Sequence, residues 1–179
     1  MISVVFRCAG VDETHRIGVL LGEAFEAGTV LLLKGELGVG KTCLVRGIAE
    51  GIGVDTGQAV TSPSYALIHE YTGRLRLFHV DLYRIGYADL EDIGFFDLPL
   101  EEGVLAVEWA ERLPEDAFSD KIEAAFDMQE DENRIITITG RGEASRRWLQ
   151  LWIARLQQNK TGHPPAMQIV EEERKDRWH

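Results

Sequence analysis

The octet GELGVGKT at positions 35–42 constrains this chain more than any other stretch. It fits the pattern G-x-x-x-x-G-K-[ST], in which a strand, a glycine-rich turn and a helix follow one another. An apolar run at residues 29–33 precedes the octet and a helical pattern follows it, so the context agrees with the pattern. The glycines let the backbone turn tightly and point successive N–H groups inward, where the positive end of the next helix adds to their attraction for phosphate oxygens. The octet therefore predicts a phosphate-binding loop, and a glycine-rich turn that binds no nucleotide is the weaker alternative.

Two side chains of this loop carry specific predictions. Lys41 is expected to reach the outer phosphates of a nucleotide, which makes it a catalytic as well as a binding residue. Thr42 is expected to hold Mg²⁺ through its hydroxyl. The other loop positions expected to contact the nucleotide are Glu36, Leu37, Gly38, Val39, Gly40 and Cys43.

The distribution of charge favours protein partners over nucleic acid. The formal net charge is −11, and the acidic excess lies before residue 141, whereas residues 141–179 are net basic. An acidic body repels the phosphates of nucleic acids, so tight and direct RNA binding by the main domain is disfavoured. A nucleotide must then be held by local dipoles and Lys41, with Mg²⁺ helping.

Cysteine usage and the pattern of apolar runs bear on the cellular compartment. Cys8 and Cys43 are the only cysteines, and their number and separation suggest neither a disulfide framework nor a zinc site. The sequence does not open with a basic region followed by a long apolar one, and no apolar run approaches the length of a membrane span. We therefore predict a cytoplasmic protein that does not enter a membrane.

Hydrophobic patterning predicts an α/β fold with a mixed sheet. Strand-like runs occur at residues 3–8, 29–33, 65–71, 75–83, 104–107, 122–128 and 134–139. Helical spacing occurs between Asp12 and Gly28 and at residues 41–50 and 144–157. Only three residues separate the run 65–71 from the run 75–83, so the two are expected to pair as an antiparallel hairpin. Such a pair within a P-loop protein makes the sheet mixed.

The chain is expected to divide into a P-loop domain and a C-terminal extension. Residues 1–145 are predicted to form the domain, and residues 146–179 a C-terminal helix and a flexible tail. The helix places Trp148 and Trp152 on one side. From Asn159 onward, glycine, prolines and charged residues predict disorder.

Two carboxylates follow buried strand-like runs. The period of two in residues 75–83 gives a face that is apolar at its start and carries His79 and Asp81 near its end, and Glu108 follows the run 104–107. The carboxyl ends of strands are the usual ligand site in open α/β sheets, and phosphoryl transfer needs acids for Mg²⁺ and for water. Asp81 is expected to bind Mg²⁺ directly or through water, and Glu108 to orient water or bind the metal. The two assignments can be exchanged, and a pair of solvated acids is the alternative.

Four further residues have two interpretations each. Thr61 and its loop could sense the outer phosphate as a switch, or form a plain polar turn. Arg84 could neutralise charge in the transition state, or pair with the acids at residues 89–102. His79 and Asp81 alone do not make a transition-metal site, so a hydrogen-bonded histidine near the nucleotide is favoured. Trp109 is interpreted first as core, and otherwise as a residue that lines the pocket or an interface.

ATP is the favoured nucleotide. GTPases of the common type carry N-K-x-D for the guanine base, and the only Asn-Lys pair here, Asn159-Lys160, continues without the aspartate.

Four stretches together resemble the TsaE (YjeE) family, the small ATPase of bacterial tRNA threonylcarbamoyladenosine (t6A) synthesis. They are GELGVGKT at 35–42, TSPSYALIHEY at 61–71, HVDLYRI at 79–85 and VEWAERL at 107–113. In order and spacing they cover residues 1 to about 140. One departure is Ser64, where the family usually has threonine, and it keeps the hydroxyl.

The resemblance implies a three-layer α/β P-loop fold and ATP at the loop. It implies work with TsaD-like and TsaB-like subunits, in which hydrolysis resets the complex that modifies adenosine 37 of tRNAs reading codons that begin with A. Contact with tRNA is expected to be indirect. By position, Lys41 and Thr42 would serve phosphates and Mg²⁺, and Thr61 the switch-like loop. The residues that would serve the metal and catalytic side are Asp81, Glu108 and Trp109.

Two other classes of function compete with an ATPase subunit. A small-molecule kinase usually carries an arginine-bearing lid over the phosphates, but the segment between Gly86 and Gly103 is acidic and has no arginine or lysine. A non-catalytic module gated by nucleotide would keep the loop and use Asp81 and Glu108 only structurally.

Overall fold

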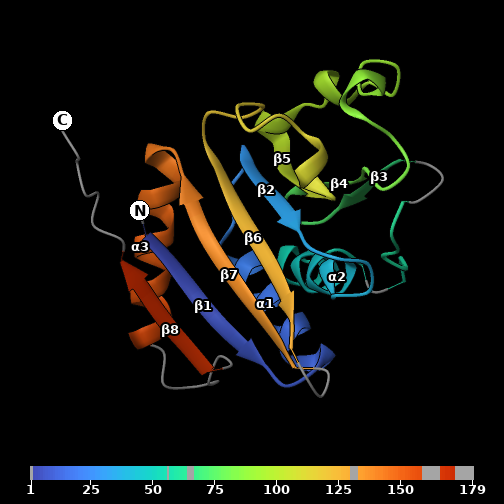
Figure 1. Ribbon diagram of the computed structural model, residues 1–179. Coiled ribbons are helices and arrows are strands. Elements are labelled where there is room, and N and C mark those ends of the chain that lie inside the picture. Colours follow the sequence, from blue (N-terminus) through green and yellow to red (C-terminus); the bar gives the residue numbers. More distant parts are fainter. Residues whose placement is uncertain (1, 56, 64–66, 130–132, 159–165, 172–179) are drawn as a thin grey trace, which may run out of the picture.

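The structure is a computed structural model that describes residues 2–55, 57–63, 67–129, 133–158 and 166–171 (Figure 1). Its strands are β1 Ile2–Cys8, β2 Thr29–Lys34, β3 Ile68–Thr72, β4 Arg76–Asp81, β5 Gly103–Glu108, β6 Lys121–Met128, β7 Arg134–Arg141 and β8 Ala166–Glu171. Its α-helices are α1 Val11–Ala24, α2 Lys41–Ile52 and α3 Glu143–Gln158. Short 3₁₀ helices are η1 Tyr87–Asp89, η2 Phe95–Asp97, η3 Leu100–Glu102 and η4 Ala110–Arg112. Within the described residues, no helix is long and apolar enough to cross a lipid bilayer.

The described strands form one mixed sheet in the order β3-β4-β5-β2-β6-β7-β1-β8. Strands β4, β5, β2 and β6 run parallel, whereas β3, β7, β1 and β8 pair antiparallel with their neighbours. The hairpin expected from the short link between residues 71 and 75 is confirmed as β3 and β4, and with it the mixed sheet. Residues 65 and 66 of the expected run lie outside the described part of the chain.

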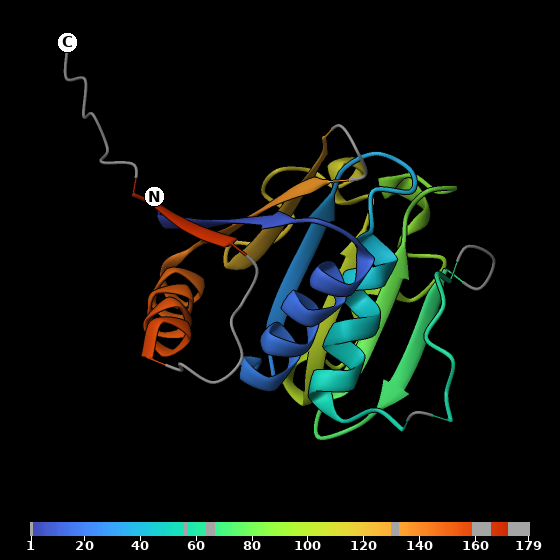
Figure 2. The same ribbon diagram turned by 90° about the horizontal axis from the view of Figure 1, so that it is seen from below.

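Layers on the two sides of the sheet confirm the three-layer fold. Helices α1, α2 and α3 cover one face, where α1 and α2 lie side by side (Figure 2). The segments that follow β4 and β5, with their 3₁₀ helices, cover the other face over β2, β4 and β5. The carboxyl ends of the parallel strands lie at one end of the sheet, between these two layers.

Four glycines bring α1 and α2 into direct backbone contact. A Cβ atom added at Gly18 would lie 2.9 Å from the Cα of Gly47, and one at Gly22 would lie 3.0 Å from the Cα of Gly51. Both helices thus show the spacing G-x-x-x-G on their facing sides. Because no side chain separates the backbones, the position of α2 is fixed closely by α1.

Helix α3 is attached to the domain through its tryptophans. The indole N–H of Trp148 donates to the carbonyl of Ala24 at 3.1 Å, and that of Trp152 to the carbonyl of Leu20 at 3.2 Å. The two indole rings stack with centroids 5.6 Å apart. The predicted tryptophan face of this helix is therefore confirmed as a packing face against α1.

The end of α1 differs from the expectation. The helix ends at Ala24, not near Gly28, and Phe25 already has extended backbone. Arg74, in the turn between β3 and β4, donates to the carbonyls of Gly22 and Phe25 and so satisfies the end of the helix. This contact is distant in sequence, so local signals could not reveal it.

The predicted disorder from Asn159 onward is wrong for residues 166–171. These residues form β8, which pairs antiparallel with β1, and Met167 and Ile169 pack against the hydrophobic core between the sheet and the three α-helices. Without β8, β1 would be an edge strand with unpaired backbone groups, and β8 pairs with these groups. The composition of the segment does not indicate this pairing. Residues 159–165 and 172–179, including the pair Asn159-Lys160, lie outside the described part of the chain.

Replacing Gly47 by alanine should destabilise the protein. Gly→Ala within a helix normally stabilises by about 1 kcal/mol. Here the new Cβ would overlap the carbonyl oxygen of His15 on α1, so a loss of about 1–3 kcal/mol is expected. Urea unfolding monitored by circular dichroism would measure it. Gly86→Ala is the control, because its nearest atom would be Asp89 Oδ2 at 3.6 Å; equal midpoints for the two variants would contradict the close packing.

Candidate active site

The predicted phosphate-binding loop connects β2 to α2, at the end of the sheet where the parallel strands have their carboxyl ends. Gly35, Gly38 and Gly40 have φ angles of 141°, 77° and 111°, which residues other than glycine rarely adopt. A Cβ atom at Gly40 would also lie 2.6 Å from Nη1 of Arg134. The sequence needs glycine here because the loop must curl before α2 begins at Lys41.

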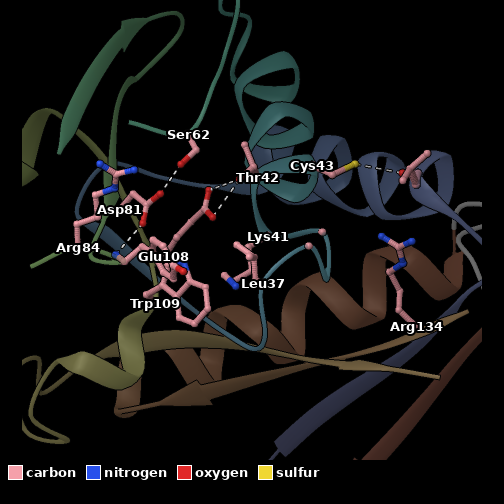
Figure 3. Close-up of a pocket in the computed structure, with 14 residues that line it drawn as sticks. Leu37, Lys41, Thr42, Cys43, Ser62, Asp81, Arg84, Glu108, Trp109 and Arg134 are labelled. Atoms are coloured by element: carbon pink, nitrogen blue, oxygen red, sulfur yellow. Dashed lines mark hydrogen bonds between the residues drawn. The ribbon is translucent and has the colours of Figure 1, made fainter. Parts of the chain in front are cut away.

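A cavity of about 450 Å³ opens above this loop (Figure 3). The sequence-predicted site residues that line it are Leu37, Gly38, Gly40, Lys41, Thr42, Cys43, Asp81, Arg84, Glu108 and Trp109. The remaining lining residues, which sequence reasoning did not select, are Val11, Ser62, Tyr83 and Arg134. Most of the predicted residues are therefore brought together in one place.

Three predicted residues do not line this cavity. The side chain of Val39 is buried, and its carbonyl accepts a hydrogen bond from Arg134. Glu36 contributes its carbonyl to Lys41. Thr61 is exposed and lines a neighbouring cavity, with its backbone N–H 3.4 Å from the hydroxyl of Tyr71. A switch role for the Thr61 loop stays a prediction.

Glu108 and Asp81 lie on adjacent strand ends, directly opposite each other in the pairing of β4 with β5. Each is 3% exposed, so neither is a solvated acid. The hydroxyl of Thr42 donates to the carboxylate of Glu108, at 2.8 Å to Oε1 and 3.0 Å to Oε2. Asp81 accepts hydrogen bonds from the Ser62 hydroxyl and from the backbone N–H of Tyr83.

This donor set fits Mg²⁺. The described residues contain no group of three or more His, Cys, Asp or Glu side chains that could hold a metal by themselves. Mg²⁺ takes oxygen ligands, and it is usually bound through one or two carboxylates together with phosphate oxygens and water. The hydroxyl of Thr42 and the carboxylates of Glu108 and Asp81 are such ligands.

The ammonium group of Lys41 lies within the loop. Its Nζ donates to the carbonyls of Gly35 at 2.5 Å and Glu36 at 2.8 Å, and it lies 3.9 Å from the ring centroid of Trp109. Burial lowers the pKa of Lys41 from its usual value, and the carboxylates of Glu108 and other acids oppose this shift. The ammonium group is therefore held at the loop by main-chain carbonyls and an aromatic face.

Trp109 is both a packing residue and a wall of the cavity. It is half-buried, packs against the hydrophobic residues between the sheet and the 3₁₀ helices, and its ring lies 4.9 Å from that of Tyr83. Its φ of 60° and ψ of 38° place a non-glycine residue in the left-handed region directly after Glu108. The chain therefore turns sharply at the end of β5, and strained backbone of this kind clusters at functional sites.

Arg134 is the main residue that sequence reasoning missed. It is 5% exposed at the start of β7, and its Nη1 donates to the carbonyl of Val39 at 3.3 Å. It brings a buried positive charge to the loop from a strand about 95 residues away. In the sequence, the only signal for Arg134 is its position at the start of a strand-like run. Ser62, by contrast, adjoins the selected Thr61.

Cys43 links the two helices at the cavity. Its thiol donates to the carbonyl of Val11 at 3.3 Å, and burial raises the pKa of this thiol. It is therefore a contact residue at the start of α2 more than a reactive thiolate.

The fold and the site define a P-loop-type α/β protein with two buried acids facing the loop. The chain belongs to the TsaE family, since the sequence model described as "Threonylcarbamoyl adenosine biosynthesis protein TsaE" matches residues 8–136.

Individual relatives agree with this assignment. The chain is 38% identical to the tRNA threonylcarbamoyladenosine biosynthesis protein TsaE of Treponema pallidum over 139 residues, which covers 74% of this chain and 98% of that protein. It is 35% identical to the protein of the same name from Bacillus subtilis, over 79% of this chain and 89% of that protein. The crystal structure of Bacillus subtilis YdiB matches with a TM-score of 0.70 at 30% identity, over 87% of this chain and 97% of that one.

The contact between Lys41 and Trp109 predicts a fluorescence signal. A polyphosphate that draws the ammonium group away from the indole face should change the emission of Trp109, and titration with Mg·ATP would measure this change. Trp109→Phe should abolish the change. Trp148→Phe should keep it, because Trp148 stacks on Trp152 and does not line the cavity. A change that persists in Trp109→Phe would show that the signal arises elsewhere.

Proposed function

We propose that this protein binds Mg·ATP in the cavity above the loop and hydrolyses it in the service of tRNA t6A synthesis. The observation that carries the proposal is the contact between Thr42 and Glu108, with Asp81 on the adjacent strand. It joins the start of the loop's helix to a buried acid, which is the arrangement that a magnesium-dependent P-loop ATPase needs. The role in t6A synthesis is supported by the names of the related TsaE proteins.

Binding of the triphosphate would rest on the loop and two cations. The backbone N–H groups between Gly35 and Thr42 and the positive end of α2 would hold the phosphates. Lys41 would turn from its carbonyl partners to the outer phosphates, and Arg134 would add positive charge on the side of Val39 and Gly40. ATP remains favoured over GTP by the missing guanine motif.

The acids would divide the work of hydrolysis. Thr42 and Glu108 are already in contact, so we assign Glu108 to the side of the metal. Asp81 is held by Ser62 and by the backbone of Tyr83, and from there it would hold a metal-bound water or orient the attacking one. Bound Mg²⁺ would neutralise charge that develops on the phosphates. Arg84, at the rim of the cavity, could add to that neutralisation.

The partners would be TsaD-like and TsaB-like subunits. In this proposal, hydrolysis resets the complex that places threonylcarbamoyl on adenosine 37 of tRNAs reading codons that begin with A. The acidic body of the protein disfavours direct tRNA contact and favours protein partners. The work would take place in the cytoplasm, where tRNA is modified.

The competing functions receive less support. A kinase needs cations over the phosphates, but the segment from Gly86 to Gly103 has none and carries short acidic 3₁₀ helices. A non-catalytic module would not require two acids buried at the phosphate-binding loop, since burying such charges is costly. Phosphate transfer to an added metabolite would support a kinase. Nucleotide binding without turnover, with the chain alone and with partners, would support a non-catalytic module.

Lys41→Ala should weaken ATP binding by about 10- to 100-fold, because it removes a charge-assisted hydrogen bond to phosphate. Isothermal titration calorimetry would measure the affinity. Lys34→Ala is the matched control, since Lys34 pairs with Glu123 and does not line the cavity. Unchanged affinity and turnover in Lys41→Ala would refute the site.

Glu108→Gln should keep nucleotide binding and lose hydrolysis. Removal of a group that orients water or metal typically costs about 10²- to 10⁴-fold in rate. Phosphate release would be measured for the chain alone and with the two candidate partner subunits, which are expected to stimulate the wild type. Wild-type turnover by the variant would remove Glu108 from the mechanism.

A further inference from the structure

His79 lies behind Glu108, outside the cavity. It is fully buried in β4, and its Nε2 lies 2.8 Å from Oε1 of Glu108. We propose that His79 is a positioning residue that fixes the carboxylate of Glu108 for metal binding and hydrolysis. This inference rests on the proposed ATPase function.

The strand register explains how the imidazole reaches this carboxylate. His79 pairs with Ala106 on β5, and Asp81 pairs with Glu108 two residues further on. Diagonal neighbours on one face of a sheet are within reach of long side chains. Because Ala106 carries only a methyl group, the ring can extend along the face to Glu108.

The hydrogen bonds define which nitrogen carries the proton. The carboxylate of Glu108 already accepts from the hydroxyl of Thr42, so His79 Nε2 donates to it. Among the described residues, Nδ1 of His79 has no hydrogen-bond partner. A proton on Nδ1 would have no acceptor among these residues, so the geometry places the proton donated to Glu108 on Nε2.

Packing alone does not account for a histidine at this position. A leucine would fill the buried space without leaving Nδ1 unsatisfied, which costs free energy. The compensating gain is a second donor to Glu108. Thr42 holds the carboxylate from the helix and His79 holds it from the neighbouring strand, so its orientation is set from both sides. Outer hydrogen bonds of this kind orient metal-binding carboxylates.

The kinetic test compares His79→Leu, His79→Gln and His69→Leu. Leucine removes the donor, whereas the amide N–H of glutamine can replace Nε2–H. His69 is the matched control, because it lies opposite His79 in the pairing of β3 with β4 and contacts Tyr71 instead. For each variant, kcat, KM for ATP and the Mg²⁺ concentration for half-maximal hydrolysis would be measured, together with ATP affinity in EDTA.

His79→Leu should raise the half-saturating Mg²⁺ concentration or lower kcat by about 10- to 100-fold, and keep ATP affinity in EDTA. His79→Gln should recover most of this loss, and His69→Leu should match the wild type. A His79→Leu variant in which both the Mg²⁺ dependence and kcat are unchanged would overturn the proposal. Equal losses in the leucine and glutamine variants, with a lowered melting temperature in both, would make His79 structural only.

A spectroscopic measurement separates this inference from the proposed function. In long-range ¹H–¹⁵N spectra of histidine-labelled protein, His79 should carry a proton on Nε2, and Glu108→Gln should shift its resonances. An Nε2 that carries no proton, or no response to Glu108→Gln, would overturn the proposal even in an active enzyme. If the wild type neither binds nor hydrolyses ATP, the proposed function fails, and the spectra alone decide whether His79 holds Glu108.

Discussion

The hydrogen bonds between Thr42 and Glu108 join two parts of the chain that are 66 residues apart. Thr42 lies in the first turn of α2, directly after the glycine-rich turn, and Glu108 ends β5. The parallel register that pairs Leu33 with Glu108 brings the end of β5 level with the start of the loop. Other parts of the site depend on this meeting point. Asp81 lies one strand further out, Lys41 precedes Thr42, and the sharp turn after Glu108 brings the next side chain to the same cavity.

Electrostatics explains why the acids and the lysine come together. Two carboxylates at paired positions of adjacent strands, each 3% exposed, repel each other and lose hydration, so their burial needs compensation. Hydroxyls from Thr42 and Ser62 supply part of that compensation. Lys41 supplies positive charge, since its charge interacts with both Asp81 and Glu108. A magnesium ion would supply more, so the same burial that makes the acids costly favours a cation as ligand.

Features of the site that depend on local sequence could be predicted, and those that depend on distant contacts could not. The glycine pattern defines the loop by itself, and an acid after a buried run marks a strand end, which is how Asp81 and Glu108 were selected. No local sequence pattern marks Arg134, because its role depends on a contact with Val39, which is distant in sequence. Strand β8 was missed for the same reason: its partner is β1, at the opposite end of the chain. The early end of α1 likewise depends on Arg74.

The packing of α1 on α2 connects the core to the chemistry. Backbones in contact at Gly18 and Gly47 allow little sliding or rotation, because the interface has no flexible side chains to absorb it. The first residues of both helices reach the same cavity, where the thiol of Cys43 on α2 donates to the carbonyl of Val11 on α1. A shift of α1 would therefore move the start of α2, and with it the hydroxyl of Thr42 relative to Glu108. The glycine contacts thus help to set a distance in the site, although none of them lies there.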